Sequence, residues 1–90
     1  MEIEKLVHDI IDPLVENKEA TGVRIMPTDD ENEVLILVLG ESNDVARLIG
    51  RGGSVADAIR KVVSVTGKLN DKHIRIKFES FDEEKKEKTL

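Results

Sequence analysis

The chain has 90 residues and a formal net charge of −5 at pH 7, and it contains no cysteine, tryptophan or tyrosine. This length allows one small domain, and the lack of cysteine excludes disulfides and thiolate metal sites. The longest apolar run, residues 34–39, is too short to cross a bilayer, and acids and lysine interrupt the first apolar positions. We therefore expect a soluble, cytoplasmic protein.

The first element is predicted to be an amphipathic helix. Apolar residues recur at spacings of three and four from Ile3 to Val15, which makes one apolar stripe on a helix. Pro13 interrupts it, because proline has no N–H to donate to the carbonyl of Asp9. We expect a kink or a loosened turn near Asp12 and an end by about Asn17.

Two strands are predicted next, over residues 21–26 and 33–39. A turn rich in proline and acids separates them at 27–32, which is typical of an antiparallel hairpin. The second strand reads Val-Leu-Ile-Leu-Val-Leu without a break. Such a run indicates a strand that is covered on both faces or one that is central in its sheet.

A short helix and a longer one follow. Ser42 or Asn43 is predicted to cap the short helix, which has Asp44 in its first turn and stops at Gly50. Ser54 is predicted as the N-cap of the longer helix, with Asp57 close to a capping box. Gly67 is predicted to end that helix in a left-handed conformation.

The last strand is predicted over residues 72–80. Its alternation places Ile74, Ile76 and Phe78 inside and the charged residues between them outside. From Phe81 onward the chain is polar and charged, so we expect a single domain over residues 1–80 and a disordered tail over 81–90.

Charge is unevenly distributed along the chain. Residues 1–44 carry a balance of −9, residues 45–68 carry +4, and residues 69–90 cancel. The positive segment contains the glycine cluster Gly50, Gly52 and Gly53. A local basic patch on an acidic body binds phosphate weakly and in a salt-sensitive way.

The segment I-G-R-G-G-S, Ile49 to Ser54, joins the two helices with almost no turn. A helix start offers unpaired N–H groups to an anion, and glycines let a sugar-phosphate chain come close. Arg51 can add a charge-assisted contact to a phosphate. We predict that this segment grips a single-stranded RNA backbone.

Further residues are candidates for the same interface. Arg47 lies beside the loop and is the better phosphate candidate; for Arg60 and Lys61, both a phosphate contact and a solvated helix face stay open. Bases are expected to lie on an aliphatic groove lined by Val45, Ile49 and Val55 and to be read by polar backbone edges, because no aromatic residue is near the loop.

Other kinds of site fit the sequence poorly. A dinucleotide fingerprint needs a strand before its first glycine, and a P-loop needs Gly-Lys-Ser/Thr. No catalytic constellation can be assembled, so we predict no enzyme, and no metal site or cofactor is expected. The acidic turn Asp29 to Glu31 lacks the calcium-loop pattern.

The string VARLIGRGGSVADAIR, residues 45–60, resembles the signature of a KH domain, in which an isoleucine precedes G-x-x-G and an aliphatic helix. The chain is similar to the small bacterial KH-domain RNA-binding family called KhpA. The resemblance implies an α+β, type II (prokaryotic) KH fold in the order αββααβ, with a three-stranded mixed sheet and three helices on one face. It also implies an RNA chaperone or post-transcriptional regulator linked to cell elongation and division. Implied partners are single-stranded RNA, a second copy in a homodimer, and a Jag-type KH protein in a heterodimer.

Two departures from the family pattern bear on affinity. Only one of the two variable loop positions is basic, Arg51, and Asp57 places a negative charge in the first turn after the loop. These features and the net charge leave an alternative open, in which the chain is a protein-interaction adaptor with weak or vestigial RNA binding.

Overall fold

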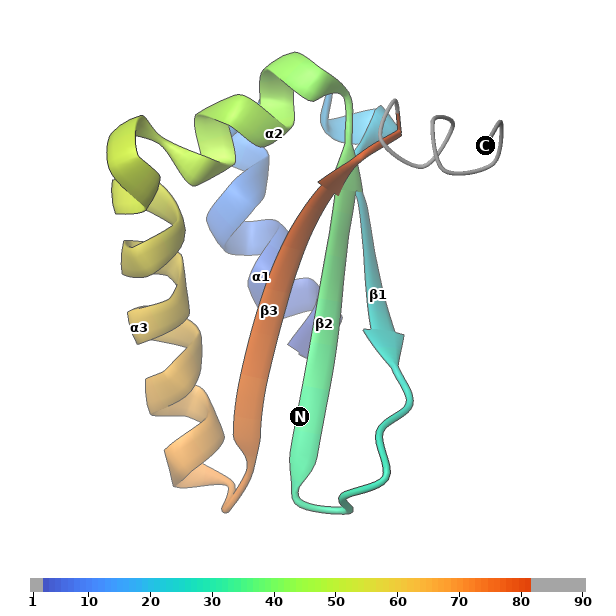
Figure 1. Cartoon of the computed structure of the whole chain (residues 1–90), viewed down its shortest axis with the longest axis vertical. Helices are drawn as coiled ribbons and strands as arrows, with labels where there is room; N and C mark the ends of the chain where they lie inside the picture. The colour runs from blue at the N-terminus through green and yellow to red at the C-terminus, as the bar shows by residue number, and fades with distance from the viewer. Residues whose placement is uncertain (1–2, 82–90) are drawn as a thin grey trace.

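The computed structural model describes residues 3–81, and its helices and strands follow the order that the sequence predicts. The helices are α1 (Ile3–Ile11), α2 (Ser42–Ile49) and α3 (Ser54–Leu69), and the strands are β1 (Gly22–Met26), β2 (Glu33–Gly40) and β3 (His73–Ser80) (Figure 1). Short 3₁₀ turns lie at 12–14, 18–20 and 51–53. Apart from Phe81, the tail predicted to be disordered lies outside the described residues.

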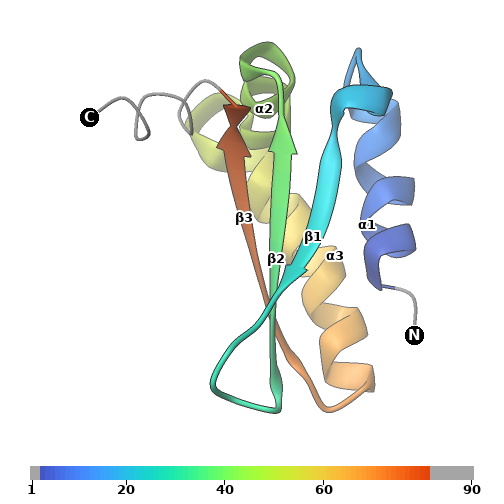
Figure 2. The same ribbon diagram turned by 90° about the vertical axis from the view of Figure 1, so that its right-hand side faces the viewer.

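β2 is the central strand of a three-stranded sheet in the order β1-β2-β3. It pairs antiparallel with β1 and parallel with β3, so the predicted hairpin and the mixed sheet are confirmed. All three helices lie on one face of the sheet, as Figure 2 shows. Of the two interpretations of the apolar run in β2, the central strand is the correct one.

The core is aliphatic and lies between the helices and this face of the sheet. Its buried members come from every helix and from two strands: Val7, Ile11, Ile36, Val38, Leu48, Ile59, Val63, Ile74 and Ile76. Burying one such side chain contributes about 1.5–3 kcal/mol. Because side chains alternate along a strand, Leu35 and Leu37 point to the opposite face, where they are only half-buried.

The end of α1 follows from its proline. The α-helix stops at Ile11, and a 3₁₀ turn over Asp12–Leu14 carries Pro13 in its first positions. Proline is tolerated in these first positions because an N–H there would have no partner within the turn. The turn closes with a hydrogen bond from Val15 N–H to the Asp12 carbonyl at 3.4 Å. The predicted loosened turn near Asp12 is confirmed.

The predicted helix caps are wrong. Glu41, not Ser42 or Asn43, is the N-cap of α2, and it makes no side-chain cap bond. Ser54 is the first residue of α3 rather than its cap, because the 3₁₀ turn runs directly into the helix and Ser54 N–H already bonds the Arg51 carbonyl. Gly53, with a φ of 82°, takes the N-cap position.

The prediction for Gly67 is also wrong. α3 continues to Leu69, and the left-handed residue after it is Asp71, with a φ of 55°. Gly67 is buried inside the helix, where a Cβ would lie 2.7 Å from the Lys72 carbonyl oxygen and 2.9 Å from Ile74 Cγ1. The glycine therefore lets the chain turn closely against α3 before it enters β3.

Candidate nucleic-acid interface

The junction between α2 and α3 is built on three glycines with positive φ. Gly50 has φ 75° and ψ 175°, Gly52 has φ 62° and ψ 17°, and Gly53 has φ 82° and ψ 12°. Residues with a Cβ rarely adopt such angles. The loop closes with a bond from Gly53 N–H to the Gly50 carbonyl at 3.2 Å. The sequence of this loop thus fixes a tight turn at the start of α3.

The glycines of this loop have different surroundings. A Cβ at Gly50 would lie 2.5 Å from Val55 Cγ2 and 2.9 Å from Val55 N, so this glycine allows α3 to begin against the end of α2. A Cβ at Gly52 or Gly53 would meet no atom within 4 Å. These two positions leave open space beside the backbone at the start of α3, where a phosphate chain can approach.

The arginines near the loop differ in what they bind. Arg51 is exposed and forms no ion pair within residues 3–81. Arg47 bonds Glu16 Oε1 at 2.8 Å and Asp44 Oδ1 at 2.9 Å. Arg60 bonds Asp57 Oδ1 at 3.1 Å. Arg51 is therefore the cation most available to an anion at the loop.

The predicted aliphatic groove is only partly assembled. Ile49 is 39% exposed beside the loop, whereas Val45 is 6% exposed and packs in the interior near Gly40. Val55 is half-buried beneath Gly50, and Ser54 is exposed. Ile49 thus offers apolar surface next to the loop, whereas the buried Val45 does not.

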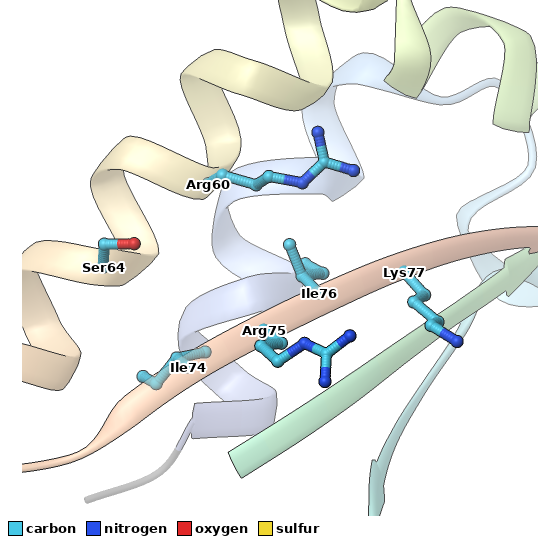
Figure 3. A pocket seen from close by; sticks show the side chains of 6 residues that line it. All are labelled: Arg60, Ser64, Ile74, Arg75, Ile76 and Lys77. Carbon is cyan, nitrogen blue, oxygen red and sulfur yellow. The ribbon is translucent and has the colours of Figure 1, made fainter. Parts of the chain in front are cut away.

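A cleft of about 410 Å³ lies between α3 and β3 (Figure 3). Arg60 and Ser64 line it from α3, and residues 74–77 line it from β3. Apart from Arg60, the sequence interpretation missed these residues, because the order of strands in a sheet is not readable from hydropathy. The alternation of apolar and charged residues along β3 was the only feature of the sequence that could have indicated these lining residues.

The outer edge of β3 faces this cleft. β3 is an edge strand, and His73 N–H donates to the Asn32 carbonyl at 2.7 Å on the β2 side. Successive residues of a strand point their N–H and C=O groups to opposite sides, so the main-chain groups of Ile74 and Ile76 point away from β2. The cleft thus combines aliphatic side chains with main-chain donors and acceptors that have no backbone partner among residues 3–81.

A buried carboxylate holds α2 in place. The Asp44 side chain is 3% exposed and accepts bonds from Glu16 N–H at 2.9 Å and Asn17 N–H at 3.1 Å, besides its bond from Arg47. The bond from Glu16 N–H lowers the pKa of Asp44, burial opposes this, and Asn17 N–H and the Arg47 guanidinium lower the pKa further. The sequence interpretation treated Asp44 only as a helix-dipole residue, because its partners are 27 and 28 positions away.

Within residues 3–81, no cluster of three or more His, Cys, Asp or Glu side chains is placed to hold a metal ion. In the same part of the chain, no helix has both the length and the apolar character needed to cross a membrane.

Comparison with known proteins agrees with this geometry. The model of the KhpA/KhpB KH-domain family matches residues 4–78. A protein named RNA-binding protein KhpA from Listeria monocytogenes strain EGD-e is 35% identical over 74 residues, which cover 82% of this chain and 95% of that protein. A protein of the same name from Bacillus subtilis strain 168 is 28% identical over 80 residues, covering 89% of this chain and 94% of that protein.

Proposed function

The chain belongs to the KhpA/KhpB family of KH domains and has a type II KH fold, and we propose that it is a single-stranded RNA-binding protein acting through the glycine loop. The observation that carries the proposal is the open space at Gly52 and Gly53, next to the free cation Arg51. The name of the relatives, RNA-binding protein, supports the same ligand class. The proposed role is binding rather than catalysis.

The loop binds the sugar-phosphate backbone in this proposal. The main chain at Gly52 and Gly53 lets a phosphate approach the start of α3, where the positive end of the helix dipole favours an anion. The Arg51 guanidinium donates to the same phosphate. This contact does not depend on the base, so the loop contributes affinity without sequence preference.

The bases lie in the cleft between α3 and β3. Ile74 and Ile76 line the cleft but are only 8% and 5% exposed, so their outward main-chain groups are the principal contacts for base edges. No aromatic residue lines the cleft, so we expect each base to be held less tightly than on an aromatic platform, where stacking is worth about 1–3 kcal/mol.

A single site of this kind is weak, and we propose that the protein acts as a dimer. Three apolar residues, Val62, Val65 and Leu69, are 52%, 59% and 81% exposed along α3, at spacings that place them on one side of a helix. A second copy that covers this row would join two RNA sites and raise the avidity.

A heterodimer with a Jag-type KH protein is the alternative assembly. A cytoplasmic RNA chaperone or regulator that acts in cell elongation and division is the role that we propose for such an assembly.

The test is charge reversal in the loop with a matched neutral control. Arg51→Asp with Gly52→Asp is compared with Arg51→Asn with Gly52→Asn, because Asp and Asn have similar shape and similar tolerance of a left-handed backbone. Circular dichroism should show both variants folded. At about 0.1 M salt, the Asp variant should lose binding to labelled single-stranded RNA, and the Asn variant should retain part of it. Wild-type binding by the Asp variant would rule out the loop, and a parallel titration with single-stranded DNA shows whether the sugar is read.

One observation favours the alternative of a protein-interaction adaptor. Two of the three arginines near the loop, Arg47 and Arg60, are already paired with carboxylates, so Arg51 is the one loop arginine without an ion pair among residues 3–81. An adaptor would bind a protein partner tightly and RNA at background level. Affinity capture with and without ribonuclease separates the two functions, since partners bridged by RNA are lost on digestion.

A further inference from the structure

The face of the sheet that carries no helix presents two cations in one row. In the strand register, Arg24 of β1 lies opposite Leu37 of β2, and Leu37 lies opposite Lys77 of β3. Residues directly opposite one another share a face of the sheet, and Leu37 points away from the helices, since its neighbours Ile36 and Val38 are in the core. With strands about 4.8 Å apart, the Cα atoms of Arg24 and Lys77 lie roughly 10 Å from each other, with Leu37 between them.

Neither cation of this row has a partner in the described part of the chain. Arg24 and Lys77 are exposed, and no ion pair or hydrogen bond of their side chains occurs among residues 3–81. By contrast, Arg75 in the neighbouring row bonds Glu33 Oε1 at 3.2 Å. In a chain with 19 acidic and 14 basic residues, two adjacent unpaired cations indicate a surface that is complementary to an anion.

This row is continuous with the cleft. Lys77 and Arg75 line the cleft at the edge of β3, and Figure 3 shows both side chains extending from β3 over β2. A single-stranded RNA that leaves the cleft across the edge of β3 therefore meets Lys77 first. It reaches Arg24 after it crosses Leu37. The half-buried Leu37 gives an apolar contact for a base between the two cations.

We propose that the helix-free face of the sheet is a second contact surface for the same RNA strand, with phosphates bound by Lys77 and Arg24. The inference depends on the proposed function, because the strand reaches this face only through the cleft. It implies that the protein binds a longer RNA segment than the loop and cleft alone can hold. A KH loop clamps about four nucleotides, so short and long RNAs are expected to respond differently to changes on this face.

The test uses the full chain with Arg24→Gln and Lys77→Gln together. The control is Lys5→Gln with Lys18→Gln, which removes the same amount of charge from exposed residues of α1 and of the 3₁₀ turn at 18–20. Each protein is titrated with single-stranded RNAs of about 5 and about 12 nucleotides at several salt concentrations. Losing two phosphate contacts should reduce the salt slope for the long RNA by about 1.4 and weaken its binding roughly 25-fold at 0.1 M salt, relative to the effect at 1 M.

We expect Arg24→Gln with Lys77→Gln to weaken binding of the long RNA and to leave binding of the short RNA unchanged. The control variant should bind both RNAs as the wild type does. An unchanged salt slope for the long RNA, or an equal loss in the control, would overturn the inference. An acidic protein segment would then be the occupant that fits the two cations. The loop variant Arg51→Asp with Gly52→Asp tests RNA binding through the loop separately from RNA binding on the helix-free face. If this variant binds both RNAs as the wild type does, the proposed function fails as well.

Discussion

Replacing Gly50 by alanine should destabilise the protein far more than replacing Gly52. At Gly50 the φ of 75° and ψ of 175° belong to a region that is nearly restricted to glycine, which costs a side chain about 1–3 kcal/mol. The new Cβ would also lie 2.5 Å from Val55 Cγ2 and 2.9 Å from Val55 N, and overpacking of this kind costs about 1–3 kcal/mol. Against this, alanine stabilises by about 0.4–1 kcal/mol through the unfolded chain. The net loss for Gly50→Ala is about 1–5.5 kcal/mol.

Gly52→Ala has only one of these costs. Its left-handed backbone, with φ 62° and ψ 17°, costs alanine about 1–2 kcal/mol, but no atom lies within 4 Å of the new Cβ. After the gain in the unfolded chain, the net loss is about 0–1.5 kcal/mol. RNA binding should nevertheless weaken, because the methyl group occupies the space that the proposed site offers to the sugar-phosphate chain.

The assay is urea denaturation followed by far-UV circular dichroism, since the chain has no tryptophan or tyrosine to report unfolding. Val55→Ala serves as a second site, because it removes the Cγ2 contact and leaves the contact to Val55 N. In that background, Gly50→Ala should cost about 1 kcal/mol less. Equal losses for Gly50→Ala and Gly52→Ala in the wild-type background would refute the reasoning, because the steric contact with Val55 would then have no energetic weight.

Two further predictions concern residues that support the site from a distance. Gly67→Ala should lower the melting temperature by roughly 4–20 °C, because the added Cβ would press on the Lys72 carbonyl and on Ile74; a calorimetric scan that shows no change would contradict the close approach seen there. Asp44→Asn should be less stable than the wild type near pH 6. The difference in the free energy of unfolding between the two proteins should narrow as the pH falls from about 5 through the lowered pKa of Asp44. The sign follows because a carboxyl with a depressed pKa in the folded state stabilises only while it is ionised. Urea midpoints of both proteins at pH 6 and pH 3 check this, and a constant gap would exclude the ionised carboxylate as the cause.

The parts of the fold that depend on local pattern could be predicted from the sequence. The break at Pro13, the alternation of β3 and the tight glycine junction all follow from neighbouring residues, and each is present. The central position of β2 was one of two possibilities, because an apolar run shows burial and does not show which strands flank it.

The features that sequence reasoning missed depend on contacts between distant segments. Asp44 accepts bonds from Glu16 and Asn17, which no local rule connects to it. Gly67 looked like a helix end, whereas its role is the close approach of Lys72 after the chain has turned. The cleft could not be predicted because it requires α3 to lie beside an edge strand, and the edge position is a property of the whole sheet.

The register of β3 limits how this protein can change in evolution. Its residues are assigned in alternation: Ile74 and Ile76 to the core, and Arg75 and Lys77 to the opposite face. A one-residue insertion or deletion in the short turn at 70–72 would exchange the two sets and bring Arg75 and Lys77 into the core. We therefore expect homologous sequences to keep the number of residues in this turn constant and to carry Gly, Asn or Asp where Asp71 has its φ of 55°.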